Sequence, residues 1–218
     1  MIHTFEPADF QRICDDLAVS DPELDVVIQL HGYPLCWNRP NSFESLVHII
    51  LEQQVSLASA LAALNKLKER IAEVTPENVL QLSDEELHAC YFSRQKTIYV
   101  KNLAEAVLNG KLDLAAMELL PDEEIRHHLT SVKGIGNWTS DIYLMFALQR
   151  ADVFPIGDLA AVNAMKRLKN VKRGTSQEAI LKLAEHWKPY RTVATMLLWH
   201  YYLANPVKRF RTGGIKVV

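Results

Sequence analysis

The sequence predicts an all-α protein. Most segments begin with a residue typical of a helix N-terminus, and the apolar residues that follow recur at helical spacing. No stretch shows sustained alternation of apolar and polar residues, and no glycine occurs between Gly32 and Gly110. Together these observations favour helices joined by short connections, without a sheet.

The expected helices follow from their start and stop signals. Asp21 with Pro22 begins a helix that ends at Gly32, and serines open the next two helices at Ser42 and Ser56. Short helices follow Thr75 and Ser83, and the run Ser-Asp-Glu-Glu at 83–86 is a capping box. Further helices are expected over 93–109, from 121 to near 132, and over 137–149, 158–168, 176–187 and 190–203.

Composition indicates a globular protein that does not enter a membrane. Of the 218 residues 49% are hydrophobic, and no apolar run approaches the ~18 residues of a membrane span. The N-terminus lacks the features of a secretion signal. We expect a monomer in the cytoplasm or, in a eukaryote, in the nucleus. Cys14, Cys36 and Cys90 are odd in number and widely spaced, so we expect buried, inert thiols.

The charge balance argues mildly against binding nucleic acid through bulk charge alone. The net charge is −2 and the pI is near 6.4. Basic residues gather in 94–101, 166–173 and 208–216, whereas acidic residues gather in 6–25 and 113–124. These groups form either opposite faces of the molecule or ordinary solvated helix surfaces.

The most informative segment is a glycine turn followed by a carboxylate. Gly134 and Gly136 lie between a helix that ends near Val132 and an apolar helix that begins near Asn137. Such a turn exposes backbone amides at a helix N-terminus, where a phosphate oxygen binds well. Asp158 follows this second helix, after the turn Phe-Pro-Ile-Gly.

Four features, in this order along the chain, resemble those of one family. They are the segment 50–56 (ILEQQVS), the hairpin 132–139 (VKGIGNWT), Asp158, and the segment 187–191 (WKPYR) with Trp199. The chain resembles the helix-hairpin-helix DNA glycosylases, and within them the 3-methyladenine DNA glycosylase II group, over roughly residues 40–205.

The resemblance implies a two-lobed helical bundle with its active site in the cleft between the lobes. Residues 36–156 would form the central bundle and include the helix-hairpin-helix at about 125–149. Residues 1–35 and 157–218 would form the second lobe. The implied activity is hydrolysis of the N-glycosidic bond of an alkylated purine flipped out of double-stranded DNA, as a step of base excision repair.

Asp158 matches the catalytic aspartate of this superfamily. Departure of a base builds positive charge on deoxyribose, and a carboxylate stabilises that charge and orients the attacking water. Asp158 is also well suited to cap the helix over 159–168, and the two roles are compatible.

Trp138 stands where strand-cutting relatives place a nucleophilic lysine, so the resemblance implies a monofunctional enzyme. The chain also lacks a trailing set of four cysteines for an iron–sulfur cluster. Trp138 and Trp199 are expected to line the base pocket, where an indole face attracts a cationic alkylated base. Ile142, which stands where close relatives often carry a pocket tyrosine, and Tyr143 are further pocket candidates, with Phe146 nearby. The tryptophans, including Trp187, could instead be core aromatics, and for Trp187 we prefer that interpretation.

The remaining candidate residues concern the DNA. By resemblance, Gln54 is the wedge that fills the gap left by the flipped base, with Gln53 beside it. The alternative is an exposed linker glutamine. Lys133, Gly134, Gly136 and Thr139 are expected to contact the DNA backbone. The carbonyls of Thr130, Val132 and Ile135 match those that hold a structural Na⁺ or K⁺ in the family, and no organic cofactor is expected. Arg191 lies either near the pocket or in a structural ion pair.

Two other functions remain open at this point. One is a catalytically silent helix-hairpin-helix module that binds DNA structures, which the presence of Asp158 disfavours. The other is a glycosylase for oxidised or mismatched bases, which Trp138 and the missing cysteine set disfavour.

Overall fold

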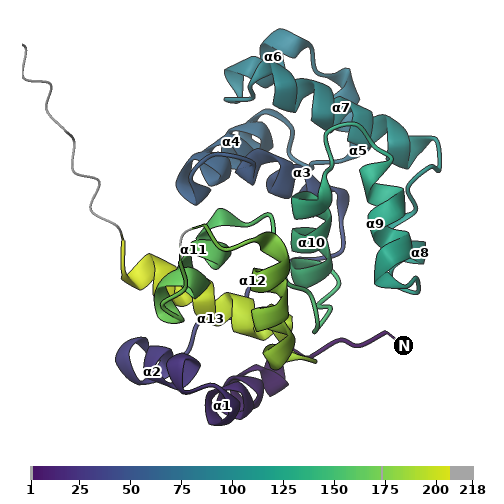
Figure 1. The fold of residues 1–218 in the computed structure, drawn as a ribbon. Coiled ribbons are helices and arrows are strands. Elements are labelled where there is room, and N and C mark those ends of the chain that lie inside the picture. Colours follow the sequence, from purple (N-terminus) through teal and green to yellow (C-terminus); the bar gives the residue numbers. More distant parts are fainter. Residues whose placement is uncertain (1, 173, 207–218) are drawn as a thin grey trace, which may run out of the picture.

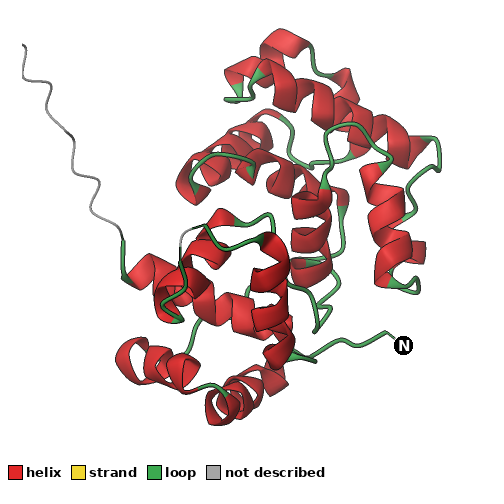
Figure 2. Cartoon of the chain, viewed as in Figure 1, coloured by secondary structure: helices red, strands yellow, loops and turns green. Residues whose placement is uncertain are grey.

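The computed structural model describes residues 2–172 and 174–206, and this part of the chain is helical, with one isolated bridge between Thr4 and Arg150 (Figures 1 and 2). The all-α prediction is therefore confirmed. The elements are η1 (Pro7–Asp9), α1 (Phe10–Ser20), α2 (Pro22–His31), α3 (Phe43–Glu52), α4 (Leu57–Arg70), α5 (Pro76–Gln81), α6 (Asp84–Ala89), α7 (Arg94–Leu108), α8 (Leu114–Met117), α9 (Asp122–Thr130), α10 (Asn137–Phe146), α11 (Leu159–Leu168), α12 (Gln177–Ala184), η2 (Glu185–Trp187) and α13 (Arg191–Ala204).

The predicted start signals act as N-caps. The hydroxyls of Ser42, Ser56 and Ser93 each accept a hydrogen bond from the backbone amide three residues later. The capping box at Ser83 is complete, because Glu86 also accepts from the backbone amide of Ser83 at 2.9 Å. Local side-chain chemistry thus fixes where these helices begin.

Some boundaries differ from the sequence-based expectation. The helix that begins at Asn137 ends at Phe146 rather than near 149, and the chain after α12 continues as the 3-10 turn η2. Helices α1 and α8 were not anticipated. The C-terminal basic residues, Lys208, Arg209, Arg211 and Lys216, lie outside the described residues.

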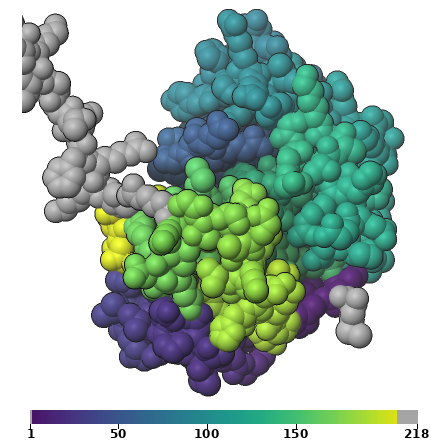
Figure 3. Space-filling model, viewed as in Figure 1, coloured from purple at the N-terminus to yellow at the C-terminus, as the bar shows by residue number. Residues whose placement is uncertain are grey.

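The helices form two groups that meet along one junction. α13 packs against α1, α2 and α11 in one group, whereas α10 packs against α3 and α9 in the other (Figure 1). In the space-filling view the region of α3 and α4 lies directly above that of α11 (Figure 3). Asp158 precedes α11 and the glycine hairpin precedes α10, so the two groups bring separate parts of the site together.

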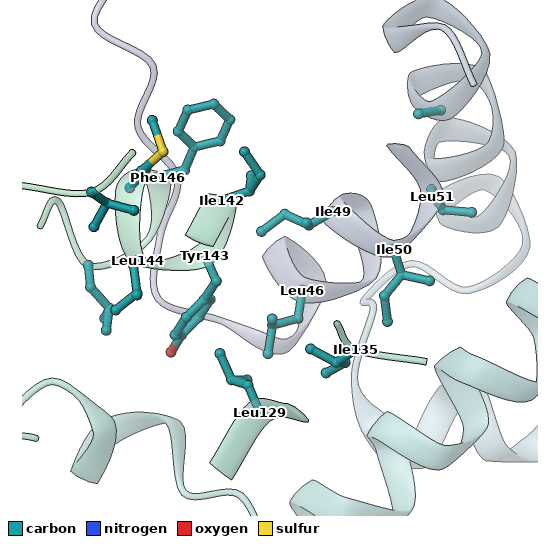
Figure 4. Packing of buried hydrophobic residues seen from close by; sticks show 14 of the residues in the cluster. Leu46, Ile49, Ile50, Leu51, Leu129, Ile135, Ile142, Tyr143, Leu144 and Phe146 are labelled. Atoms are coloured by element: carbon teal, nitrogen blue, oxygen red, sulfur yellow. The ribbon is translucent and has the colours of Figure 1, made fainter. Parts of the chain in front are cut away.

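The core of the second group is built on α3 and α10. Leu46, Ile49 and Ile50 of α3 are fully buried and face side chains of α9 and α10 (Figure 4). α10 is buried along nearly its whole length, which is typical of a central helix. This packing holds the hairpin at the N-terminus of α10 in a fixed position.

Other buried groups have structural partners. The indole of Trp187 is 1% exposed and donates to Asp21 Oδ2 at 2.6 Å, as preferred for a core aromatic. The three cysteines are free thiols, and burial raises the pKa of each, that of Cys14 to about 12. Among the described residues, no helix is long and apolar enough to cross a membrane.

An ion pair links the two helices of the hairpin motif. Arg126 of α9 donates through Nε to Asp141 Oδ1 of α10 at 3.0 Å. Burial raises the pKa of the Asp141 carboxyl to about 6, although Arg126 opposes the shift. Asp141 therefore keeps its proton in the folded protein to higher pH than in the unfolded chain.

This shift predicts a pH-dependent contribution to stability. The ordinary pKa of Asp141 is 3.8 and its folded value is about 6, so between them the folded state binds more protons than the unfolded state. The stabilisation is complete below about pH 4 and is lost as pH rises through about 6. The free energy of unfolding, measured in urea, should fall relative to that of Asp141→Asn by on the order of 2–3 kcal/mol over this range. Glu123→Gln is the comparison: Glu123 is an exposed partner of Arg126 and one of the lesser charges that raise the pKa of Asp141, so its removal should move the transition only slightly to lower pH. A pH-independent difference between wild type and Asp141→Asn would contradict the shift.

Candidate functional site

Asp158 is a helix cap whose carboxylate receives hydrogen bonds from three directions. Its Oδ1 accepts from the backbone amide of Ala161 at 2.8 Å, which caps α11. Trp138 donates through Nε1 to Oδ2 at 2.9 Å, and Trp199 donates through Nε1 to Oδ1 at 3.0 Å. The carboxylate is thus fixed in position while it remains half-buried.

The two tryptophans reach Asp158 from different helix groups. Trp138 lies in the first turn of α10, two residues after Gly136, whereas Trp199 lies on α13. Both indoles are partly exposed, and both direct their N–H edge at the same carboxylate. The structure therefore brings together three residues that lie 20 and 41 positions apart in the sequence.

Further rings extend this site into an aromatic cluster. The Trp199 ring lies 5.7 Å from that of Trp37 and 5.7 Å from that of Phe146, with both contacts edge to face. Phe146 was a sequence-based candidate, but Trp37 was not, because it lies in a segment without a recognisable motif.

The structure places two predicted pocket residues in the core instead. Ile142 is 2% exposed and Tyr143 is fully buried, and both side chains pack among residues of α3 and α9 (Figure 4). The Tyr143 hydroxyl donates to Asn41 Oδ1 at 2.6 Å. Because residues 142–146 of α10 (IYLMF) are an unbroken apolar and aromatic run, the sequence does not distinguish the face toward the cleft. We leave both residues out of the proposed pocket.

The glycine hairpin has the backbone geometry that its sequence suggests. Gly134 has a φ of 103°, and a Cβ there would overlap the ring of Tyr99 on α7, so this position requires glycine. Gly136 precedes α10 and no side chain caps that helix, so its first amides are directed outward. Lys133 beside them is exposed. A negatively charged ligand would find both the helix dipole and a cation here.

Gln53 ties the α3–α4 turn to the hairpin. Its Nε2 donates to the carbonyl oxygen of Gly134 at 3.0 Å and to Oγ1 of Thr139 at 2.9 Å. Thr139 is 1% exposed, so its hydroxyl faces Gln53 rather than an external ligand. These contacts make both residues parts of the scaffold, while a DNA contact of Thr139 and a wedge role of Gln53 stay predictions.

Gln54 differs from its neighbour. It is exposed and has a φ of 58°, a left-handed conformation uncommon for residues other than glycine. The tight turn that this conformation creates directs the chain outward between α3 and α4. Gln54 therefore occupies a position from which a side chain can reach a bound molecule.

A groove of about 550 Å³ runs between this turn and the hairpin. Its lining combines polar side chains with the exposed hairpin backbone, and Lys96 on α7 is its cation. Burial lowers the pKa of Lys96, whose ammonium donates to the carbonyl oxygen of Leu51 at 2.5 Å. The groove is lined by Gln53, Gln54, Val55, Tyr91, Ser93, Gln95, Lys96, Tyr99, Gly134, Ile135 and Gly136.

Arg191 belongs to a structural ion pair. It donates to both carboxylate oxygens of Asp152, at 2.7 and 2.9 Å, and to the carbonyl of the same residue at 3.0 Å. The structure thus selects the structural alternative for this residue.

A second ion pair, which the sequence did not reveal, lies beside the aromatic cluster. Arg39 makes a bidentate pair with Glu52, the last residue of α3, with bonds of 3.0 and 2.5 Å. The Arg39 guanidinium also lies over the Phe146 ring, 5.2 Å from its centroid. Residues 13 positions apart carry no spacing signal that would predict this pair.

Comparisons with known proteins agree with this geometry. Residues 47–189 match the family described as HhH-GPD superfamily base excision DNA repair protein. DNA-3-methyladenine glycosylase 1 of Schizosaccharomyces pombe is 34% identical over 72% of this chain and 71% of its own length.

Solved structures give the same result. The 3-methyladenine DNA glycosylase Mag1 of S. pombe, in complex with abasic DNA, superposes with a TM-score of 0.79 at 31% identity, over 86% of this chain and 95% of that one. The DNA-3-methyladenine glycosidase of Bacillus halodurans superposes with a TM-score of 0.72 at 31% identity, over 85% of this chain and 87% of its own.

The contacts of Trp199 predict a loss of activity from the removal of one hydrogen bond. Trp199→Phe keeps an aromatic ring but removes the donor to Asp158, so single-turnover base excision should fall by about tenfold or more. Trp187→Phe is the matched control, because it removes an indole bond to Asp21 instead. That control should lower thermal stability and leave excision unchanged below its melting temperature. Equal effects of the two variants on excision would contradict the role of Trp199.

The adjacent glutamines should respond differently to the same truncation. Gln53→Ala leaves the Thr139 hydroxyl and the Gly134 carbonyl without this partner, so the free energy of unfolding should fall by about 1–3 kcal/mol. Gln54→Ala removes an exposed side chain and should change stability by less than about 0.5 kcal/mol, while base flipping weakens. Urea unfolding and the fluorescence of 2-aminopurine opposite the lesion measure the two effects. A large stability loss for Gln54→Ala with normal flipping would contradict the assignment.

Proposed function

The chain belongs to the HhH-GPD superfamily of base excision DNA repair proteins, and we propose that it is a monofunctional DNA glycosylase that removes alkylated purines of the 3-methyladenine and 7-methylguanine type from double-stranded DNA. The observation that carries this proposal is the Asp158 carboxylate, held by two indoles beside a hairpin that exposes backbone amides.

The position of Asp158 suits hydrolysis of the N-glycosidic bond. As the base leaves, positive charge develops on the sugar, and a fixed carboxylate stabilises that charge without reorganising. The same oxygens can orient the attacking water. The side chains that hydrogen-bond Asp158 in the described part of the chain are tryptophans, which offer no amine for a Schiff base. This supports release of the base without cleavage of the strand.

Alkylated purines fit the pocket for electrostatic reasons. Alkylation at N3 of adenine or N7 of guanine makes the base cationic, and indole faces attract cations by about 0.5–2 kcal/mol. Trp138 and Trp199 converge where the base would lie if Asp158 faces its sugar. The names of the relatives, which include 3-methyladenine glycosylases from yeast and bacteria, support the same substrate class.

Access to this pocket requires that the nucleotide leave the duplex. We assign Gln54 as the side chain that fills the gap, because it is exposed at a tight turn beside the groove. The amides of Gly134 and Gly136, together with Lys133, would bind the backbone of the DNA strand without reading its sequence. Because its substrate is DNA, we place the protein in the cytoplasm of a bacterium or the nucleus of a eukaryote. We also propose that it acts as a monomer.

The hairpin carbonyls suit the monovalent ion that the family implies. The carbonyls of Thr130 and Val132 lie at the C-terminal end of α9, where the helix dipole is negative, and the Ile135 carbonyl follows in the turn. Neutral oxygens of this kind suit Na⁺ or K⁺. Such an ion would supply positive charge next to the phosphate site, and the proposed chemistry needs no organic cofactor.

Substitution of Asp158 tests the proposal directly. Asp158→Asn keeps a side-chain oxygen to cap α11 but removes the negative charge, so excision of 7-methylguanine from a duplex should fall by at least about 10²-fold. The new NH2 group cannot accept from an indole, so one of the two indole hydrogen bonds is lost and the melting temperature should fall slightly. Affinity for the same duplex should stay near the wild-type value.

Two outcomes would overturn the proposal. Unchanged excision in Asp158→Asn would remove this residue from the chemistry. DNA binding by the wild-type protein without release of any methylated base would instead identify a non-catalytic DNA-binding module.

A further inference from the structure

The ion pair of Arg39 and Glu52 is one of the more buried ion pairs of the described residues, together with Lys169–Asp21 and Arg126–Asp141. The Arg39 side chain is 19% exposed and that of Glu52 is 6% exposed, and the two are joined by a bidentate pair of hydrogen bonds. Desolvating two charges costs free energy, and an apolar pair of similar volume is often at least as stable. The burial of this pair is therefore poor evidence for a purely stabilising role.

Its location connects it to the proposed pocket on two sides. The guanidinium of Arg39 lies over Phe146, whose ring contacts Trp199, and Trp199 in turn donates to Asp158. Glu52 ends α3, two residues before Gln54. The pair therefore lies between the residue assigned to fill the gap in the duplex and the aromatic cluster next to Asp158.

Glu52 balances the positive charge of Arg39, which would otherwise oppose the binding of a cationic base. Arg39 places a permanent positive charge on the aromatic cluster to which a cationic alkylated base would also bind. Two cations on one cluster repel each other strongly in partly buried surroundings. His48 adds no positive charge at neutral pH, because burial and then Arg39 lower its pKa. Glu52 lies within 3.6 Å of the His48 ring and within hydrogen-bond distance of Arg39, so its carboxylate is the compensating charge.

We propose that Glu52 is a specificity-determining residue of the base pocket, which neutralises Arg39 so that the pocket accepts a positively charged base. Arg39 supplies the charge that Glu52 compensates, and its place is fixed by the backbone, because its amide donates to the carbonyl of Phe146 at 2.9 Å while its guanidinium lies over the ring of that residue. The inference rests on the proposed excision of alkylated purines.

The test compares three variants of the full chain on one cationic substrate. Glu52→Gln preserves size but leaves the charge of Arg39 uncompensated, so single-turnover excision of 7-methylguanine should fall by about tenfold or more. Arg39→Gln leaves the negative charge of Glu52, which attracts a cation, so excision should stay within about threefold of wild type or rise. The double variant removes both charges and should excise 7-methylguanine faster than Glu52→Gln.

A second measurement separates charge from structure. Affinity for the same duplex with a tetrahydrofuran abasic analogue, which carries no base, should be alike in all four proteins. If Glu52 only stabilises the fold, Glu52→Gln lowers this affinity together with excision, and that result would overturn the proposal. If Glu52→Gln does not fold, Arg39→Gln still tests the proposal. A fall in its excision rate of tenfold or more, with normal affinity for the analogue, would contradict the proposal that Glu52 compensates the charge of Arg39.

This test can fail independently of the proposed function. Release of 7-methylguanine by the wild-type protein establishes the activity, whereas only the order of the variants bears on Glu52. A wild-type protein that releases no methylated base would overturn both.

Discussion

The fixed position of one carboxylate is the constraint on which the rest of the structure depends. Asp158 caps α11, and indoles from α10 and α13 hold its two oxygens. Because these helices belong to different groups, the site exists only where the groups are packed together. The Arg191–Asp152 pair joins α13 to the segment that follows α10. Within the other group, the packing of α3 on α10 and the hydrogen bonds of Gln53 hold the hairpin in place. Catalysis by a pre-positioned charge requires this kind of rigidity.

The polar side chains near the site fall into two sets, those that hold helices together and those that are exposed to a ligand. Polar side chains with several protein partners, such as Gln53, Thr139 and Arg191, are used to hold elements together. Others are left exposed: Gln54 lines the groove at the hairpin, and Lys133 precedes the hairpin glycine Gly134, which also lines it. Adjacent glutamines thus have opposite roles, and only their contacts distinguish them.

The sequence predicted the helices well because their signals are local. Serine caps such as Ser42 and Ser83 act within three residues, and the glycines of the hairpin and the cap Asp158 are equally local. It predicted less of the pocket, because Trp37, Arg39 and Glu52 meet Phe146 and Trp199 only through tertiary packing. Ile142 and Tyr143 were assigned to the pocket but lie in the core, since the unbroken apolar run 142–146 carries no sign of which side of the helix meets the cleft.

The central claim is that Asp158 acts on water at the sugar of an extruded nucleotide, with no covalent bond to the protein. The most direct measurement is treatment of a reaction on 7-methylguanine duplex with borohydride, followed by analysis of base, strand and protein. The account predicts free 7-methylguanine, an unbroken strand whose abasic sugar has been reduced to the alcohol, and no protein attached to DNA. A borohydride-trapped complex of protein and DNA would contradict it.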